Sequence, residues 1–131
     1  MRPEDLKSDY PNFEDWFTKV KYDIYFGGKI LILRLNEKGE IVAIAILKLT
    51  KREKKICVFK VLEAYRGNGE SSKFMEYILT ITGSKPLITV SSNRLSEYQK
   101  LFNKFGFELC KVYDNYYKEG LSEYCFNGFL N

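Results

Sequence analysis

The spacing of apolar residues changes along this chain, and each spacing predicts a different element. Residues 29–35, 41–49 and 56–62 are runs rich in β-branched and aliphatic side chains, which is typical of strands. The first two runs are joined by NEKGE, in which Gly39 can adopt positive φ, and the next two by a polar segment at residues 50–55. We therefore expect three consecutive antiparallel strands joined by hairpins.

Two later segments carry apolar residues at spacings of three and four, which is typical of amphipathic helices. In the first helix these residues are Phe74, Met75, Ile78, Leu79 and Ile81. In the second they are Leu95, Tyr98, Leu101, Phe102 and Phe105. A glycine follows each segment, Gly83 and Gly106, as expected where a helix ends. A short strand at residues 86–90 separates the helices, and two β-like runs follow at residues 107–113 and 122–129.

The N-terminal part is predicted to contain one further helix, at residues 12–22. Asn12 is a candidate N-cap, and Phe13, Trp16, Phe17 and Val20 recur at helical spacing. The predicted order of elements is α-β-β-β-α-β-α-β-β, which indicates an α/β (α+β) fold.

Length and composition are those of one folded domain, residues 1–131. Hydrophobic residues make up 45% and aromatic residues 16% of the chain, enough apolar surface for a core. The longest aliphatic run, residues 41–47, is too short to cross a bilayer, and the start of the chain lacks the apolar segment of a secretion signal. We expect a cytoplasmic protein that does not enter a membrane.

Some kinds of chemistry are excluded by missing residue types. The chain has no histidine, so it lacks the usual base at neutral pH and the commonest metal ligand. Cys57, Cys110 and Cys125 lie far apart without metal-binding spacing, so we expect reduced packing residues and no metal site. The net charge of +4 suits an anionic partner. The densest basic segment, residues 48–55, fits a solvated hairpin turn better than a nucleic-acid patch.

The stretch YRGNGESS, residues 65–72, is a candidate binding site. A strand that passes through a glycine-rich turn into a helix leaves backbone N–H groups free at the positive end of the helix dipole, where phosphates bind. Gly67 and Gly69 allow close backbone approach, Arg66 adds a charge, and Ser71 or Ser72 offers a hydroxyl or a helix cap. A plain turn with a serine cap explains the stretch alone equally well. The P-loop pattern is absent, and so is the acidic residue that a dinucleotide fold needs.

The segment Arg66-Gly67-Asn68-Gly69-Glu70-Ser71 resembles the Arg/Gln-x-x-Gly-x-Gly/Ala signature of the GNAT superfamily of acyl-CoA-dependent N-acyltransferases, with Ser71 where glycine or alanine is usual. The strand at residues 87–91 and the helix that ends NKFGFE follow in the family's order, so the resemblance covers residues 28–131. It implies a mixed, mostly antiparallel central sheet flanked by helices. It also implies acetyl-CoA or another acyl-CoA as co-substrate, and a primary amine as acceptor.

In that family the fourth strand splays away from the fifth and binds the pantetheine arm with its free edge. The resemblance assigns this role to Phe59, Lys60 and Val61, where a backbone N–H would also polarise the thioester carbonyl. It assigns the pyrophosphate to Arg66, Gly67, Asn68, Gly69, Glu70, Ser71 and Ser72. Asn93 lies near the position of an asparagine that contacts the pantetheine in the family, but its spacing to Gly106 is two residues longer.

A neutral amine attacks a thioester readily once both are held close, so the missing histidine is tolerable. The family often places a tyrosine four residues before the Gly-Phe pair to protonate the departing thiolate, and this chain has Phe102 there. Tyr98, one turn earlier on the same helix face, is the candidate substitute, although a core role is also open. The sequence prefers none of the carboxylates that could accept the amine's proton: Glu63, Asp114, Glu119 and Glu123. We name Glu63 with Tyr98 as the candidate catalytic residues.

The acceptor is expected to enter from the side opposite the cofactor, between the first helix and the loop before the last strand. This region is aromatic and acidic, which suits a cationic amine, although packing under the loop or a dimer contact would explain its tyrosines equally well. Its aromatic and acidic residues are Tyr113, Tyr116, Tyr117, Tyr124, Asp114, Glu119 and Glu123.

Two alternatives to an enzyme stay open. One is a degenerate relative that binds CoA without turnover, suggested by Ser71 and Phe102, and the other is a small basic nucleic-acid-binding module. For an enzyme, the acceptor is a small molecule, a peptide N-terminus, a lysine or an aminoacyl-tRNA, and a charged tRNA is the one nucleic acid expected as a partner. The protein is expected to be a monomer or a homodimer.

Overall fold

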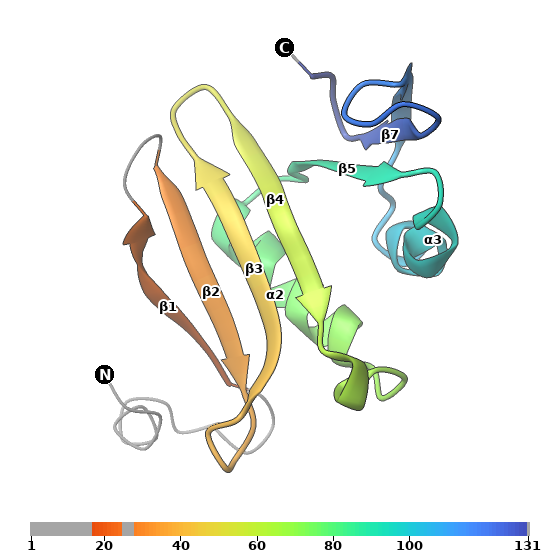
Figure 1. Cartoon of the computed structure of the whole chain (residues 1–131). Coiled ribbons are helices and arrows are strands. Elements are labelled where there is room, and N and C mark those ends of the chain that lie inside the picture. The colour runs from red at the N-terminus through yellow and green to blue at the C-terminus, as the bar shows by residue number, and fades with distance from the viewer. Residues whose placement is uncertain (1–16, 25–27, 131) are drawn as a thin grey trace.

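The computed structural model describes residues 17–24 and 28–130, with side chains described from residue 28 onward (Figure 1). The described strands form one seven-stranded sheet in the order β1-β2-β3-β4-β5-β7-β6. Neighbouring strands are antiparallel except β4 and β5, which are parallel, so the predicted mixed, mostly antiparallel sheet is confirmed. The strands are β1 (Phe17–Ile24), β2 (Lys29–Leu35), β3 (Ile41–Leu49), β4 (Lys54–Val61), β5 (Leu87–Ser91), β6 (Leu109–Asp114) and β7 (Ser122–Phe126).

The predicted first helix is wrong where it falls within the described residues. Residues 17–22 belong to β1, which pairs antiparallel with β2, and residues 12–16 lie outside the described part of the chain. In the sequence of β1, FTKVKYDI, the side chains of Val20, Tyr22 and Ile24 alternate with charged ones. This period of two, with the backbone hydrogen bonds gained by pairing with β2, outweighs the few apolar residues at helical spacing.

The three predicted strands in the first half of the chain are confirmed as β2, β3 and β4. β2 and β3 have the predicted bounds, and β4 begins slightly earlier than predicted. Gly39 has a φ of 81° in the first hairpin, as expected. The basic segment between β3 and β4 is an exposed turn, in which the Glu53 N–H donates to the Thr50 hydroxyl (2.9 Å) and Lys48 pairs with Glu53 (3.5 Å).

Helices α2 (Glu70–Thr82) and α3 (Leu95–Lys104) close the core against the sheet. Figure 1 shows α2 behind β3 and β4, where its Phe74 is fully buried. Phe102 of α3 is fully buried beside Phe126 of β7. Burying each such side chain contributes about 1.5–3 kcal/mol. Within the described residues, no helix has the length and apolar character needed to span a bilayer.

Strands β4 and β5 run together only at their beginning. Their pairing ends with Ile56 opposite Ile88, and the strands then diverge (Figure 1). A β-bulge accompanies the divergence, because Cys57 is an extra residue on β4 between the positions that pair with consecutive residues of β3. No described strand pairs with residues 58–61 of β4 on this side, so the splayed fourth strand that the resemblance implies is present.

Candidate functional site

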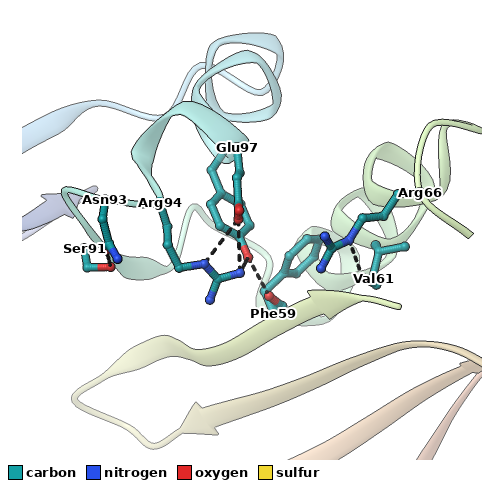
Figure 2. A network of polar contacts seen from close by, with 8 residues as sticks. Phe59, Val61, Arg66, Ser91, Asn93, Arg94 and Glu97 are labelled. Carbon is teal, nitrogen blue, oxygen red and sulfur yellow. Dashed lines mark hydrogen bonds and ion pairs between the residues drawn. The ribbon is translucent and has the colours of Figure 1, made fainter. Parts of the chain in front are cut away.

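The free edge of β4 presents the backbone of Phe59 and Val61. The Tyr98 hydroxyl donates a hydrogen bond to the Phe59 carbonyl (3.1 Å). The Nε of Arg66 donates to the Val61 carbonyl (3.0 Å), as Figure 2 shows. The N–H and C=O of one strand residue point to the same side, so the N–H groups of Phe59 and Val61 face the same gap. The backbone of Lys60, between them, is turned toward β3. Two of the three residues predicted to bind pantetheine thus offer backbone groups to the gap.

A hollow of about 590 Å³ lies in front of this edge, between β4, α3 and the loop that leads into α2. Its walls include most of the predicted pyrophosphate loop together with the β4 edge, so the fold brings these two predicted features to one cavity. The lining residues are Phe59, Val61, Arg66, Gly67, Gly69, Glu70, Ser71, Ser72, Glu97, Tyr98, Lys100, Leu101 and Lys104.

The loop before α2 has the geometry of an anion site. Gly67 (φ 88°) and Gly69 (φ 78°) lie in the left-handed region, and no described heavy atom lies within 4 Å of a Cβ built at either position. The first helical hydrogen bond runs from the Lys73 N–H to the Gly69 carbonyl (3.2 Å). The N–H groups of residues 70–72 precede this bond, so they have no partner within the helix. These amides at the positive end of the helix dipole, beside open space, fit a phosphate group.

The predicted serine cap of α2 is wrong. The N-cap is Gly69, and Ser71 and Ser72 lie in the first turn, where they line the hollow. Glycine suits the cap because a positive φ strains most residues that carry a Cβ. The serines are therefore available to a ligand rather than to the helix end.

The charged side chains give the hollow a positive potential. Its two carboxylates each pair with an arginine, Glu70 with Arg34 and Glu97 with Arg94 (3.1 Å). The remaining charged residues in the lining are all basic, and such a cavity attracts a ligand that carries several phosphates. These residues are Arg66, Lys100 and Lys104.

Tyr98 is held at the centre of the site by polar and aromatic contacts. Besides donating to the Phe59 carbonyl, its hydroxyl accepts a hydrogen bond from Arg94 (3.1 Å). Its ring stacks on Phe102 (5.7 Å between centroids) and meets Phe59 edge-on (6.4 Å). Burial raises the pKa of the Tyr98 phenol, and the nearby Arg94 guanidinium partly opposes that rise. The hydroxyl therefore keeps its proton at neutral pH.

Phe102, where the family often has tyrosine, belongs to the core. It has no exposed surface, and its ring packs against Phe107 (5.2 Å) and Phe126 (4.7 Å). Tyr98, one turn earlier, is the residue of α3 whose hydroxyl reaches the free edge of β4.

A second hollow of about 270 Å³ lies in the wedge between β4 and β5. It shares Phe59 and Tyr98 with the larger one, so the hydrogen bond between these residues stands at the boundary of the two hollows. Glu123 of β7 lines the second hollow, opposite Ser91 in the register of β5 and β7. Burial raises the pKa of Tyr117, and Tyr116 and the Glu123 carboxylate add to the rise.

Three other predicted residues, Glu63, Asn68 and Asn93, line neither hollow. Glu63 is exposed in the short η2 turn (Glu63–Tyr65) after β4, and Asn68 is an exposed residue of the loop. Asn93 accepts a hydrogen bond from the Ser91 hydroxyl (2.6 Å). None of the three is among the residues that line either hollow, and their assignment to catalysis or cofactor binding stays a prediction.

The loop between β6 and β7 is aromatic and exposed. Tyr116 packs between Tyr113 (5.3 Å) and Tyr117 (4.7 Å), and Tyr117 is 61% exposed. Asp114 accepts a hydrogen bond from the Ser122 hydroxyl (2.7 Å), which closes the base of the loop. The tyrosines therefore stack on one another at the surface beside the wedge.

The cysteines divide into two kinds. All three are free, as predicted, and Cys125 is buried as a packing residue. Cys57 and Cys110 are exposed, so the predicted packing role is wrong for both. Cys57 is exposed because the β-bulge displaces it from the core-facing alternation of β4. Among the described residues, no three potential metal ligands come together.

Sequence reasoning missed the basic residues of α3 and the ion pair that involves Arg34. Arg94, Glu97, Lys100 and Lys104 are three or four positions apart, so they lie on one face of α3. Only the fold shows that this face borders the hollow. Arg34 did carry a signal. It is the one charged residue after Lys29 in KILILRL, and a cation inside a buried strand needs an anionic partner.

Comparison with known proteins finds a matching family model and solved structures with a similar fold. Residues 12–124 match the family model described as Acetyltransferase (GNAT) domain. A search of curated proteins finds no match.

Three solved structures illustrate the similarity of fold. A proposed streptothricin acetyltransferase from Bacillus anthracis, in complex with acetyl coenzyme A, is 14% identical with a TM-score of 0.67, covering 99% of this chain and 95% of that chain. Ard1 from Thermoplasma volcanium is 19% identical with a TM-score of 0.64, covering 94% and 74%. Naa50 from Arabidopsis thaliana, in complex with the bisubstrate analogue CoA-Ac-MVNAL, is 24% identical with a TM-score of 0.62, covering 76% and 72%.

Proposed function

Because this chain belongs to the GNAT acetyltransferase family, we propose that it is an N-acetyltransferase that moves the acetyl group of acetyl-CoA to a primary amine. The observation that carries the proposal is the meeting of two hollows at the free edge of β4. One hollow has the open loop and the basic lining that a CoA diphosphate requires, and the other contains a carboxylate. A thioester and an amine can thus approach the same strand edge from opposite sides.

The loop and the β4 edge hold the cofactor in this proposal. The first-turn amides of α2 and the Arg66 guanidinium bind the diphosphate, and the open space at Gly67 and Gly69 lets it approach the backbone. The backbone of Phe59 and Val61 pairs with the amides of the pantetheine arm and polarises the thioester carbonyl through an N–H group. The Phe59 carbonyl then exchanges its bond with Tyr98 for one with the pantetheine.

Tyr98 and Glu123 handle the protons. The amine nitrogen forms a bond to the acetyl carbon, and the carbon–sulfur bond breaks. Glu123, in the second hollow, here the acceptor-side hollow, takes one proton from the bound ammonium, directly or through water, so that the neutral amine can attack. The second N–H proton leaves once the amide bond has formed and replaces, through water, the proton that Tyr98 gives to the sulfur. Tyr98 supplies a proton to the sulfur, because its phenol is protonated and stands at the boundary of the two hollows. Glu63, exposed after β4, is the second candidate base and needs a chain of waters to reach the amine.

The acceptor proposed here is a cationic amine. The hollow beside Glu123 and the exposed tyrosines of the neighbouring loop provide a carboxylate and aromatic faces, which bind ammonium groups. The screen described next distinguishes a small molecule, a peptide N-terminus and a lysine as the acceptor.

The proposal is tested by incubating the protein with acetyl-CoA and a panel of polyamines, amino acids and short peptides, and measuring release of free thiol. We expect saturable, amine-dependent release with at least one amine. Calorimetry with acetyl-CoA alone accompanies the assay. Binding without turnover on any amine would support the second candidate function, a CoA-binding relative without catalysis, which is favoured by the buried Phe102 at the family's tyrosine position.

A further inference from the structure

An ion pair joins the pyrophosphate loop to the middle of the sheet. The Nε of Arg34, in β2, contacts the Oε2 of Glu70, the first residue of α2. Arg34 is 4% exposed, and the Glu70 side chain is 18% exposed. Figure 1 shows that the end of β2 and the beginning of α2 lie at the same end of the sheet. Residues 36 positions apart thus fix the helix start against the strand.

Glu70 presents an electrostatic problem for the proposed cofactor. It lines the larger hollow and stands at the helix N-terminus, the position that favours any anion. A carboxylate there repels a diphosphate and also competes with it for the first-turn amides. The loop can accept a diphosphate only if the Glu70 carboxylate is turned away and its charge is compensated.

Packing alone gives no reason for the two charges. Burying an ion pair costs desolvation free energy, and an apolar pair of similar volume is generally as stable or more stable. Removing one partner, in contrast, leaves a buried or half-buried charge without compensation. The arrangement is therefore sensitive to the loss of either member in a way that an apolar contact would not be.

We propose that Arg34 is a positioning residue for cofactor binding, which holds the Glu70 carboxylate against β2 and cancels its charge so that the first-turn amides of α2 stay available to a diphosphate. The inference rests on the proposed binding of acetyl-CoA in the larger hollow. It adds a requirement outside the loop itself, on a strand that does not contact the hollow.

Three variants test the inference by calorimetry with acetyl-CoA: R34M, E70Q and the double variant R34M/E70Q. R34M leaves the Glu70 carboxylate uncompensated, so its affinity should fall about tenfold or more. E70Q removes the negative charge at nearly constant volume, so its affinity should stay within about threefold of the wild type or increase. The double variant should regain affinity relative to R34M, because no carboxylate remains at the loop.

The matched control is K48M, which removes one partner of the Lys48–Glu53 ion pair at the opposite end of the sheet and should leave affinity unchanged. Thermal unfolding of every variant accompanies the titrations. A purely structural role predicts that the double variant binds no better than R34M, and that result would overturn the inference. Weaker binding by E70Q would also overturn it, and this variant decides the question if R34M does not fold.

The same titrations separate this inference from the proposed function. If the wild type binds acetyl-CoA and R34M binds it equally well, only the role of Arg34 is refuted. If the wild type shows no heat of binding, the proposed function and the role of Arg34 both fail.

Discussion

At the scale of single residues, the site depends on where one phenol stands on α3. The position that often carries tyrosine in the family is Phe102, and its ring is enclosed by other aromatic rings. Tyr98, one turn earlier, has its ring in the same aromatic cluster but its hydroxyl at the β4 edge. A helix presents residues four apart on the same face, so the acid can move by one turn without a change of fold.

Tyr98→Phe should lower kcat for amine acetylation by about a hundredfold, because it removes the proposed proton donor to the thiolate. The KM for acetyl-CoA should change much less, since the variant loses only a hydrogen bond that the pantetheine replaces. Steady-state kinetics with the best amine of the panel measure both. Tyr77→Phe, on α2 and outside the lining of both hollows, is the matched control and should retain the wild-type kcat. An equal loss of kcat in the two variants would refute the role of Tyr98.

The pH dependence of kcat in the wild type and in Tyr98→Phe gives a second test of the role of Tyr98. Burial raises the pKa of the Tyr98 phenol, so its proton is lost only above the ordinary tyrosine value of about 10. Wild-type kcat should therefore hold through neutral pH and fall only at strongly alkaline pH. The Y98F variant has no such proton, and its lower kcat should show no alkaline decline from this source. An alkaline decline of the same shape in both proteins would assign it to another group.

Replacing each carboxylate with an amide distinguishes the two candidate bases, Glu123 and Glu63. Glu123→Gln should lower kcat at least about tenfold, because Glu123 lines the acceptor-side hollow. Glu63→Gln should change kcat little, because Glu63 is exposed after β4 and lines neither hollow. Thiol-release kinetics at saturating acetyl-CoA measure both variants. The reverse ranking would transfer the role to Glu63.

At the scale of elements, the site is the junction of a diverging strand, a glycine loop and a helix start. The bulge at Cys57 and the early end of β4–β5 pairing open the gap, and the left-handed Gly69 turns the chain so that the first-turn amides of α2 point into it. The strand, the loop and the helix start are consecutive along the chain, and α3 supplies the remaining wall of the cavity.

Gly69→Glu tests this junction. A side chain at position 69 enters the open space of the hollow, adds a negative charge near the diphosphate and strains a residue with φ of 78°. We expect affinity for acetyl-CoA to fall about tenfold or more by calorimetry. Gly83→Glu is the control, because Gly83 also has positive φ (71°) and open space but lies at the other end of α2. Unchanged affinity in G69E would contradict the loop assignment.

The elements also show what sequence reasoning can and cannot reach. Runs of β-branched and aliphatic residues, with the turn residues between them, define β2 and β3 to their last residue, and helical spacing defines α2 and α3 closely. Around β1, Phe17 and Val20 continue a helical spacing while Val20, Tyr22 and Ile24 alternate as in a strand, and only pairing with β2 decides between the two periods. The bulge at Cys57 has no local signature. Contacts between distant positions, such as Tyr98 with Phe59 and Arg34 with Glu70, depend on the packing of the whole sheet.

At the scale of the whole molecule, the sheet consists of two parts with a weak join. Strands β1 to β4 form one part and β5, β7 and β6 the other, and the two parts meet through a short parallel pairing that ends at Ile56 and Ile88. Beyond this pairing the parts are held by the core beneath α2 and α3 and by the Tyr98 hydrogen bond to Phe59. A ligand that lies along β4 and contacts α3 would therefore link them.

Acetyl-CoA should stabilise the folded protein through this link. At a concentration of about 100 times Kd, binding adds about 2.7 kcal/mol to the free energy of unfolding, which corresponds to a rise of roughly 10 °C in Tm for a chain of this size. Amide hydrogen exchange should slow most at Phe59, at Val61 and in the first turn of α2, because these N–H groups gain partners. G69E should show neither change at the same ligand concentration. Protection confined to the loop between β6 and β7 would place the cofactor outside the larger hollow and contradict the assignment of the β4 edge.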